Sequence, residues 1–161
     1  MASISGGDKI NQVLADMLKG AEIRMNVGIL AGSTNEDTGE PIAPYAAANE
    51  FGTKTIPARP FMRNTAADKT SEWADVAAKA MKGQAQNADG FRNAFTILGM
   101  TAAQDIKDTI EHSVPPPNAQ STIDAKRRKG RAMPEMTLVD SGSMQRAVDF
   151  EIIEGNDNEP A

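Results

Sequence analysis

The chain has 161 residues, of which 40% are hydrophobic, 24% are charged and only 4% are aromatic. This composition suits one globular domain with a core of aliphatic side chains, and it excludes wholesale disorder. The sequence contains no cysteine and has a net charge of −5. These features exclude disulfides and thiolate metal sites, fit a reducing cytoplasm, and argue against a protein that coats nucleic acid.

The first third of the chain predicts a helix, a strand and a second helix. Apolar residues recur at helical spacing over Asp8–Lys19, and they alternate with polar residues or glycine over Glu22–Leu30, which indicates a half-buried strand. Gly28 in this strand indicates a bulge or a close backbone neighbour. A polar loop is predicted over 31–43, followed by a short helix over Pro44–Gly52 that the glycine ends.

Two long helices are predicted in the middle of the chain. An extended segment, Thr53–Pro60, comes first, because each of its prolines holds the preceding residue out of helical space. A helix then runs over Asn64–Lys82 and another over Ala88–His112, where Pro115–Pro117 follows and stops it. Their apolar stripes are Trp73, Val76, Ala77, Ala80 and Met81 in the first helix, and Phe91, Phe95, Leu98, Ala102, Ile106 and Ile110 in the second.

The last predicted elements are a short basic helix and a second strand. The helix covers Ser121–Lys129 and is closed by Gly130. In the strand, over 146–153, apolar and acidic residues alternate. We expect this strand to pair with the one over Glu22–Leu30. Two strands make a small sheet whose edges are either protected or used to bind another chain.

The predicted fold class is α+β: a small antiparallel sheet packed against two long helices and shorter helices, with extended proline-rich loops. One domain is expected over 8–153. A flexible N-terminus over 1–7 precedes it, and an acidic flexible tail over 154–161 follows it.

No set of residues predicts an active site, a metal site or a cofactor. The single histidine, His112, has no cysteine with which to bind zinc, and Asp140–Ser143 is not a nucleophile elbow. Gly28–Gly32 lacks the lysine and serine or threonine of a phosphate-binding loop. The sequence also has no stretch long and apolar enough for a membrane span, and its first residues lack the features of a signal peptide. We therefore expect no enzyme, no cofactor, no metal and no membrane partner.

The strongest charge feature, here called the basic run, places five cations against one anion between Asp124 and Arg131. It invites contact with phosphates or with an acidic protein surface, although a solvated loop explains it equally well. Aromatic residues for base stacking are missing from it. The candidate contact residues are Lys126, Arg127, Arg128, Lys129 and Arg131.

A second candidate surface is the stiff segment around Ile56–Arg63. Two prolines fix its backbone, and preordered chain loses little entropy when it docks on a partner. Its arginines carry planar cations that suit an interface. The candidate interface residues are Glu50, Phe51, Ile56, Pro57, Arg59, Pro60, Phe61 and Arg63.

The order of the motifs resembles one family. Tyr45-Ala46, Glu50–Thr53 and Ile56–Arg63 precede a long helical stretch, which is followed by Pro116–Ile123, the basic run and Leu138–Gly142. Over Val27–Ile152 this arrangement is similar to the tail-completion, or virion-morphogenesis, proteins of tailed bacteriophages, a group that includes minor tail protein Z and related neck proteins. Ser141 stands where the family often has threonine, and Met133–Thr137 lengthens the approach to it.

The resemblance implies a non-enzymatic virion protein of the neck or tail, which completes the tail or joins it to the filled head. Such proteins usually work as rings, commonly hexameric, around the channel through which DNA passes. The implied partners are further copies of the chain, neighbouring neck, connector or tail-tube proteins, and DNA in transient passage. Assembly would take place in the host cytoplasm. On this hypothesis the stiff segment and loop 31–43 pack against neighbours, while the basic run faces DNA or an acidic connector surface.

Three alternatives remain at this point. The chain could be a tail terminator or a head-side stopper. It could belong to another class, a small nucleic-acid-binding module that uses the basic run. An enzyme working through paired carboxylates is disfavoured, because no pair lies where burial would shift its pKa.

Overall fold

The structure, a computed structural model, describes residues 23–84 and 88–154. The predicted helix over 8–19, the predicted N-terminus over 1–7 and residues 155–161 of the predicted tail lie outside the described residues. The elements in chain order are β1 (Ile23–Ile29), α2 (Ile42–Phe51), α3 (Phe61–Gln84), α4 (Ala88–Glu111), α5 (Gln120–Arg128), α6 (Ser143–Arg146) and β2 (Val148–Glu154).

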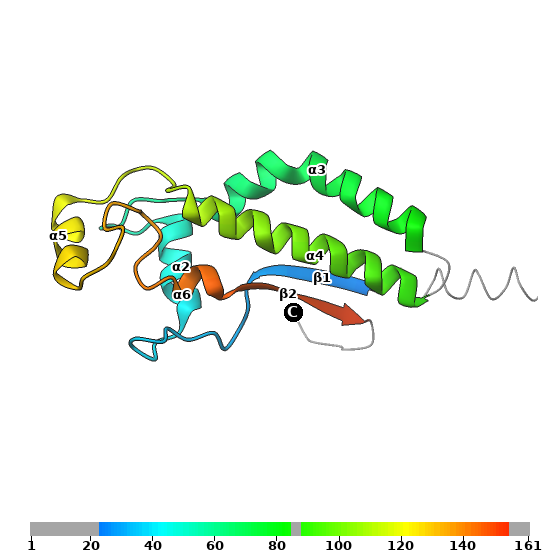
Figure 1. Cartoon of the computed structure of the whole chain (residues 1–161), viewed down its shortest axis with the longest axis horizontal. Coiled ribbons are helices and arrows are strands. Elements are labelled where there is room, and N and C mark those ends of the chain that lie inside the picture. Colours follow the sequence, from blue (N-terminus) through cyan, green and yellow to red (C-terminus); the bar gives the residue numbers. More distant parts are fainter. Residues whose placement is uncertain (1–22, 85–87, 155–161) are drawn as a thin grey trace, which may run out of the picture.

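The described elements form three layers, with α4 in the middle (Figure 1). One face of α4 packs on the two-stranded sheet, and α3 packs on another face of α4. The loops and the short helices α2, α5 and α6 gather toward one end of the long axis. The predicted α+β fold is thus confirmed.

The two strands pair as the alternation of the sequence predicts. They are antiparallel, with Met25 opposite Ile152, Val27 opposite Phe150 and Ile29 opposite Val148. Because side chains alternate between the faces of a strand, this register puts the apolar residues on one face. The other face carries exposed Arg24, Asn26, Asp149 and Glu151.

Two glycines allow the sheet to meet its neighbours closely. A Cβ on Gly28 of β1 would lie 2.6 Å from the methyl carbon of Met62, so the close neighbour is a side chain and not the backbone segment that the sequence predicts. A Cβ on Gly99 of α4 would overlap the ring of Phe150 and approach the sulfur of Met25. The helix can lie flat on the sheet only because this position has no side chain.

The core is aliphatic, as the composition predicts. Its largest fully buried side chains are Phe61, Ile42, Ile110 and Val148. The α3–α4 contact adds two side-chain hydrogen bonds, from the indole of Trp73 to Asp105 (2.7 Å) and between Thr65 and Thr109 (2.6 Å). The predicted stripe of α4 is confirmed at Ala102, Ile106 and Ile110, which are all buried.

Helices α2 and α3 differ most from the predicted boundaries. Helix α2 begins at Ile42 rather than Pro44, and α3 begins at Phe61 rather than Asn64 and continues past Gly83 to Gln84. The early start of α3 has a tertiary cause. The carboxylate of Glu50 accepts hydrogen bonds from the backbone N–H groups of Met62 (2.9 Å) and Arg63 (3.1 Å). A side chain from α2 therefore satisfies the first turn of α3, and no local pattern reveals it.

The contact of α4 with the sheet gives a test. Gly99→Ala should lower the free energy of unfolding by about 1–2 kcal/mol, since overpacking outweighs the gain in helix propensity. Gly83→Ala is the matched control, because a Cβ there meets nothing within 4 Å, and it should be neutral or stabilising by up to about 1 kcal/mol. Urea unfolding followed by circular dichroism measures both. Equal effects of the two substitutions would contradict the close contact.

Candidate functional site

Glu50 and Arg63 anchor the segment between α2 and α3. Glu50 is only 3% exposed, and its carboxylate pairs with the guanidinium of Arg63 at 2.9 Å. Arg63 also donates to the backbone oxygen of Glu50 (2.7 Å) and lies 5.0 Å from the ring centre of Phe51. One carboxylate thus caps α3 and ties it to the end of α2, which sets the ends of the stiff segment.

Arg59 connects this segment to the proline loop that follows α4. Its side chain is 6% exposed, and it donates to the carbonyl oxygens of Pro116 (2.8 Å) and Pro117 (3.2 Å). Its own backbone N–H donates to the carbonyl of Asn49 (2.6 Å). Burial lowers the pKa of Arg59. The guanidinium therefore binds two loops that are far apart in sequence.

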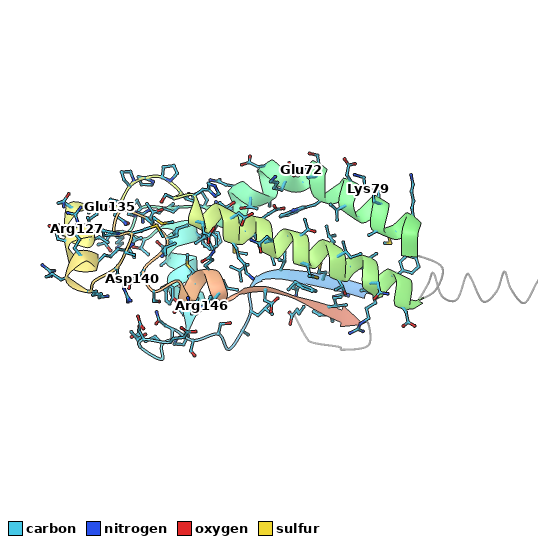
Figure 2. The ribbon with its side chains drawn as sticks, in the orientation of Figure 1. Glu72, Lys79, Arg127, Glu135, Asp140 and Arg146 are labelled. Atoms are coloured by element: carbon cyan, nitrogen blue, oxygen red, sulfur yellow. The ribbon has the colours of Figure 1, made fainter. Side chains whose placement is uncertain are left out.

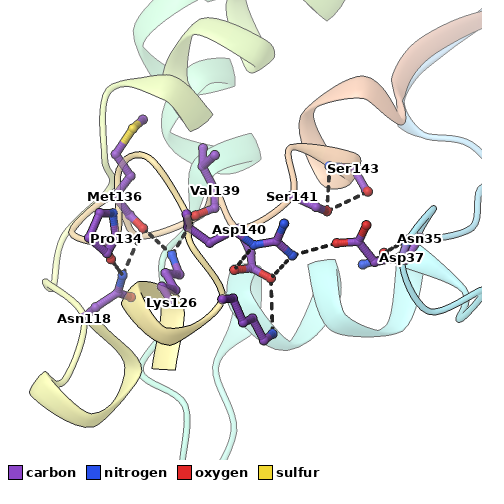
Figure 3. A network of polar contacts seen from close by, with 12 residues as sticks. Asn35, Asp37, Asn118, Lys126, Pro134, Met136, Val139, Asp140, Ser141 and Ser143 are labelled. Atoms are coloured by element: carbon purple, nitrogen blue, oxygen red, sulfur yellow. Dashed lines mark hydrogen bonds and ion pairs between the residues drawn. The ribbon is translucent and has the colours of Figure 1, made fainter. Parts of the chain in front are cut away.

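Asn118 and Lys126 extend the connection to residues 134–139 (Figure 3). The Asn118 amide donates to the carbonyl of Met136 (2.9 Å), and the Lys126 ammonium donates to the carbonyls of Met136 and Val139 (2.6 Å each). Lys126 is 7% exposed. Burial and the charge of Arg59 lower the pKa of Lys126, and the Asp140 carboxylate partly offsets this shift. Lys126 is therefore an internal cross-link, which corrects the expectation that it faces DNA or a partner.

The rest of the basic run is largely paired with carboxylates from other parts of the chain. Arg127 pairs with Glu135 (2.7 Å) at the α5 end of the molecule (Figure 2). Arg131 pairs with Asp37 (2.6 Å) and Asp140 (3.1 Å), and Lys129 pairs with Asp140 (3.5 Å). These ion pairs also lower the pKa of Asp140. Burial raises the pKa of Asp140, but Arg131 and Lys129 outweigh it and leave that pKa below its ordinary value.

This pairing changes the charge of the surface. Asp37, Asp124, Glu135 and Asp140 now stand against the five cations. Arg128 is exposed and has no carboxylate partner among the described residues. The strong positive patch that the sequence alone indicates is thus close to neutral in the folded chain.

The candidate interface residues divide into two groups. Glu50, Arg59 and Phe61 are buried, so these three side chains hold the subunit together, and Arg59 also lines a surface pocket. Phe51 is 68% exposed, Pro57 and Arg63 are exposed, and Ile56 and Pro60 are half-buried. The second group is what a neighbour could reach.

The histidine and the two serines considered above as catalytic candidates form local hydrogen-bond contacts. The Nδ1 atom of His112 lies 2.6 Å from the backbone oxygen of Asp108, and the hydroxyls of Ser141 and Ser143 lie 2.7 Å apart. Within residues 23–84 and 88–154, no three acidic, histidine or cysteine side chains are grouped to hold a metal ion. In the same part of the chain, no helix has the length and hydropathy to cross a membrane.

The comparisons with known proteins return no relatives. No family model, no curated protein and no solved structure matches the chain.

The internal role of Lys126 can be tested against its neighbour on α5. Lys126→Met should lower the free energy of unfolding by about 2 kcal/mol, because two carbonyl groups lose a charged donor. Arg128→Met is the matched control and should change it by less than about 0.5 kcal/mol, because Arg128 is exposed. Urea unfolding measures both. A Lys126 variant as stable as the Arg128 variant would contradict the cross-link.

Proposed function

We propose that this chain is a structural protein of a tailed-bacteriophage virion. It acts in the neck or tail, where a ring of its copies completes the tail and joins it to the head around the DNA channel. Its partners are further copies of itself and the neck, connector or tail-tube proteins above and below the ring.

The observation that carries the proposal is that the motifs behind the family resemblance contact one another. Arg59, in the Ile56–Arg63 motif, donates to carbonyls of Pro116 and Pro117, where the second motif begins. Lys126, in the basic run that follows the second motif, donates to the carbonyl of Val139 in the third motif, Leu138–Gly142. Chance matches to three short motifs have no reason to meet in space, whereas parts of one working unit do.

The surface of the subunit offers places for neighbours. Within the described residues, β1 and β2 each have one edge without a strand partner. The exposed face carries Arg24 on β1, and Asp149 and Glu151 on β2. Like charges disfavour pairing of identical edges, and opposite charges favour β1 of one copy beside β2 of the next. A head-to-tail contact of this kind is what closes a ring.

The pairing of the basic run favours this proposal over a nucleic-acid-binding module. A module that grips duplex DNA needs unpaired cations to neutralise phosphates, and here Asp37, Glu135 and Asp140 already pair with most of them. A near-neutral surface suits a channel through which DNA must move. A tail terminator or head-side stopper would use the same surfaces and stays as the alternative within the phage class.

Electron microscopy of particles that lack this protein tests the function. We expect filled heads and finished tails that are not joined, and addition of the purified chain should join them. Joined particles in its absence would exclude the proposed role. A salt-dependent affinity of the purified chain for duplex DNA would instead favour the nucleic-acid-binding module.

Phe51 tests the proposed interface without disturbing the core. Phe51→Ser should leave the free energy of unfolding within about 1 kcal/mol, since the ring is 68% exposed, yet it should lower the yield of joined particles at least tenfold. Met133→Ser is the control, because this side chain is 57% exposed on a loop that we place outside the interface. If the Phe51 variant joined heads to tails at the normal yield, the proposal that the stiff segment lies in the interface would be wrong.

A further inference from the structure

A cavity of about 500 Å³ lies where the stiff segment, the proline loop after α4 and the start of α5 meet. Its apolar walls include Ile56, Pro57 and Pro117, and its polar groups include Arg59, Thr122 and Thr137. We call it the Arg59 pocket. It is large enough for a short peptide segment, and the family resemblance assigns no ligand to it.

The Arg59 pocket contains a buried positive charge that has no counter-ion within residues 23–84 and 88–154. Arg59 is 6% exposed, and its side chain donates to the neutral oxygens of Pro116, Pro117 and Asn118. Among the described residues no carboxylate pairs with it, and its Nη1 group has no acceptor. A largely buried cation whose protein partners are all neutral is costly, and an anion placed beside its free Nη1 group recovers part of that cost.

Two further groups at the pocket have no side-chain partner in the part of the chain that the structure describes. The hydroxyl oxygen of Thr137 is buried, and it has no hydrogen-bond partner in the described part of the chain. Helix α5 starts at the same cavity, through Ala119 and Thr122, and no side chain caps its first turn. The N-terminus of a helix carries a partial positive charge and free N–H donors. A buried arginine, an unpaired hydroxyl and an uncapped helix thus surround one space, and all three suit an anion.

We propose that the Arg59 pocket binds a carboxylate of the acidic segment 155–161 from a second copy of the chain. This proposal rests on the proposed ring and names one of its contacts. The segment carries Asp157 and Glu159, followed by Pro160. A carboxylate meets the guanidinium and the helix terminus, and the proline meets the apolar wall formed by Pro57 and Pro117.

The resulting contact is heterologous, because the pocket of one copy receives the tail of the next. Such contacts repeat around an axis and close into a ring when the rotation allows it. The acidic segment and the buried arginine then neutralise each other at every interface. On this proposal, part of the net negative charge of the chain stabilises contacts between copies.

Cysteine pairs provide a direct test, because the natural chain has none. One full-length chain carries Pro57→Cys at the pocket, and another carries Pro160→Cys. When the two are mixed and oxidised, we expect a disulfide between them in most of the protein. A chain with Met133→Cys replaces the first as the control and should cross-link at least tenfold less. Equal cross-linking at both positions would overturn the proposal.

A chain that carries both Pro57→Cys and Pro160→Cys decides which copy supplies the tail. A ladder of linked copies on a denaturing gel supports the proposal, whereas a disulfide confined within single chains overturns it.

The chemistry is tested by charge removal in the full chain. Asp157→Asn with Glu159→Gln should weaken association at least tenfold by mass photometry. Thr137→Val should weaken it several-fold without changing the melting temperature, because the hydroxyl has no described partner to lose. Unchanged association in both variants would overturn the carboxylate assignment. Dissociation by millimolar inorganic phosphate, but not by a peptide of residues 154–161, would assign the pocket to phosphate instead.

These outcomes are distinguishable from failure of the proposed function. If the cysteines link neighbouring copies but particles without the protein are still joined, the contact is right and the phage role is wrong. If heads and tails separate without the protein but the cysteines do not link, the phage role stands and the contact is wrong.

Discussion

The structure depends on one buried carboxylate. Glu50 lies in the last turn of α2, yet its carboxylate oxygens lie at the start of α3, where they accept hydrogen bonds from two backbone N–H groups and from the guanidinium of Arg63. Burying a carboxylate is costly unless hydrogen bonds and a counter-charge satisfy it. Satisfied in this way, it fixes the distance between two helices that are joined by a segment rich in proline. Phe61 then enters the core as the first residue of α3, and Arg59 is placed two residues before it.

Arg59 is a second buried charge that connects separate segments through hydrogen bonds. A guanidinium with five donors can bind several carbonyl groups at once, and here it binds the proline loop that follows α4. Asn118 and Lys126 continue the chain of contacts to residues 134–139. The loops at this end of the molecule have backbone oxygens without helix or strand partners, so these oxygens need donors from side chains. Buried cations supply them, and a pocket with an unmatched positive charge is the consequence.

The core of the subunit is small, and few of its side chains are large rings. A two-stranded sheet is marginal alone, and here α4 covers one face while the edges stay open within the described residues. Large rings are few, and Phe51 is exposed while Phe61 is fully buried. On the proposed function, part of the apolar surface is buried only when copies assemble, so that stability is shared between the subunit and the ring.

The elements themselves were predictable because their causes are local. Alternation over β1 and β2 and helical spacing over α3 and α4 each depend on residues close in sequence, and their pairing follows from the need to bury one face. The sequence likewise determined that the core is aliphatic and that no cysteine chemistry is present. The roles of charged residues were decided by the tertiary structure alone. Lys126 and Arg59 look like surface cations in the sequence, and both are buried because carbonyl groups from distant loops surround them. Asp37 neutralises Arg131 across ninety-four positions of the chain. The ionic and hydrogen-bond partners of a charged side chain are the groups that folding brings within a few ångströms of it, and local sequence patterns do not reveal them.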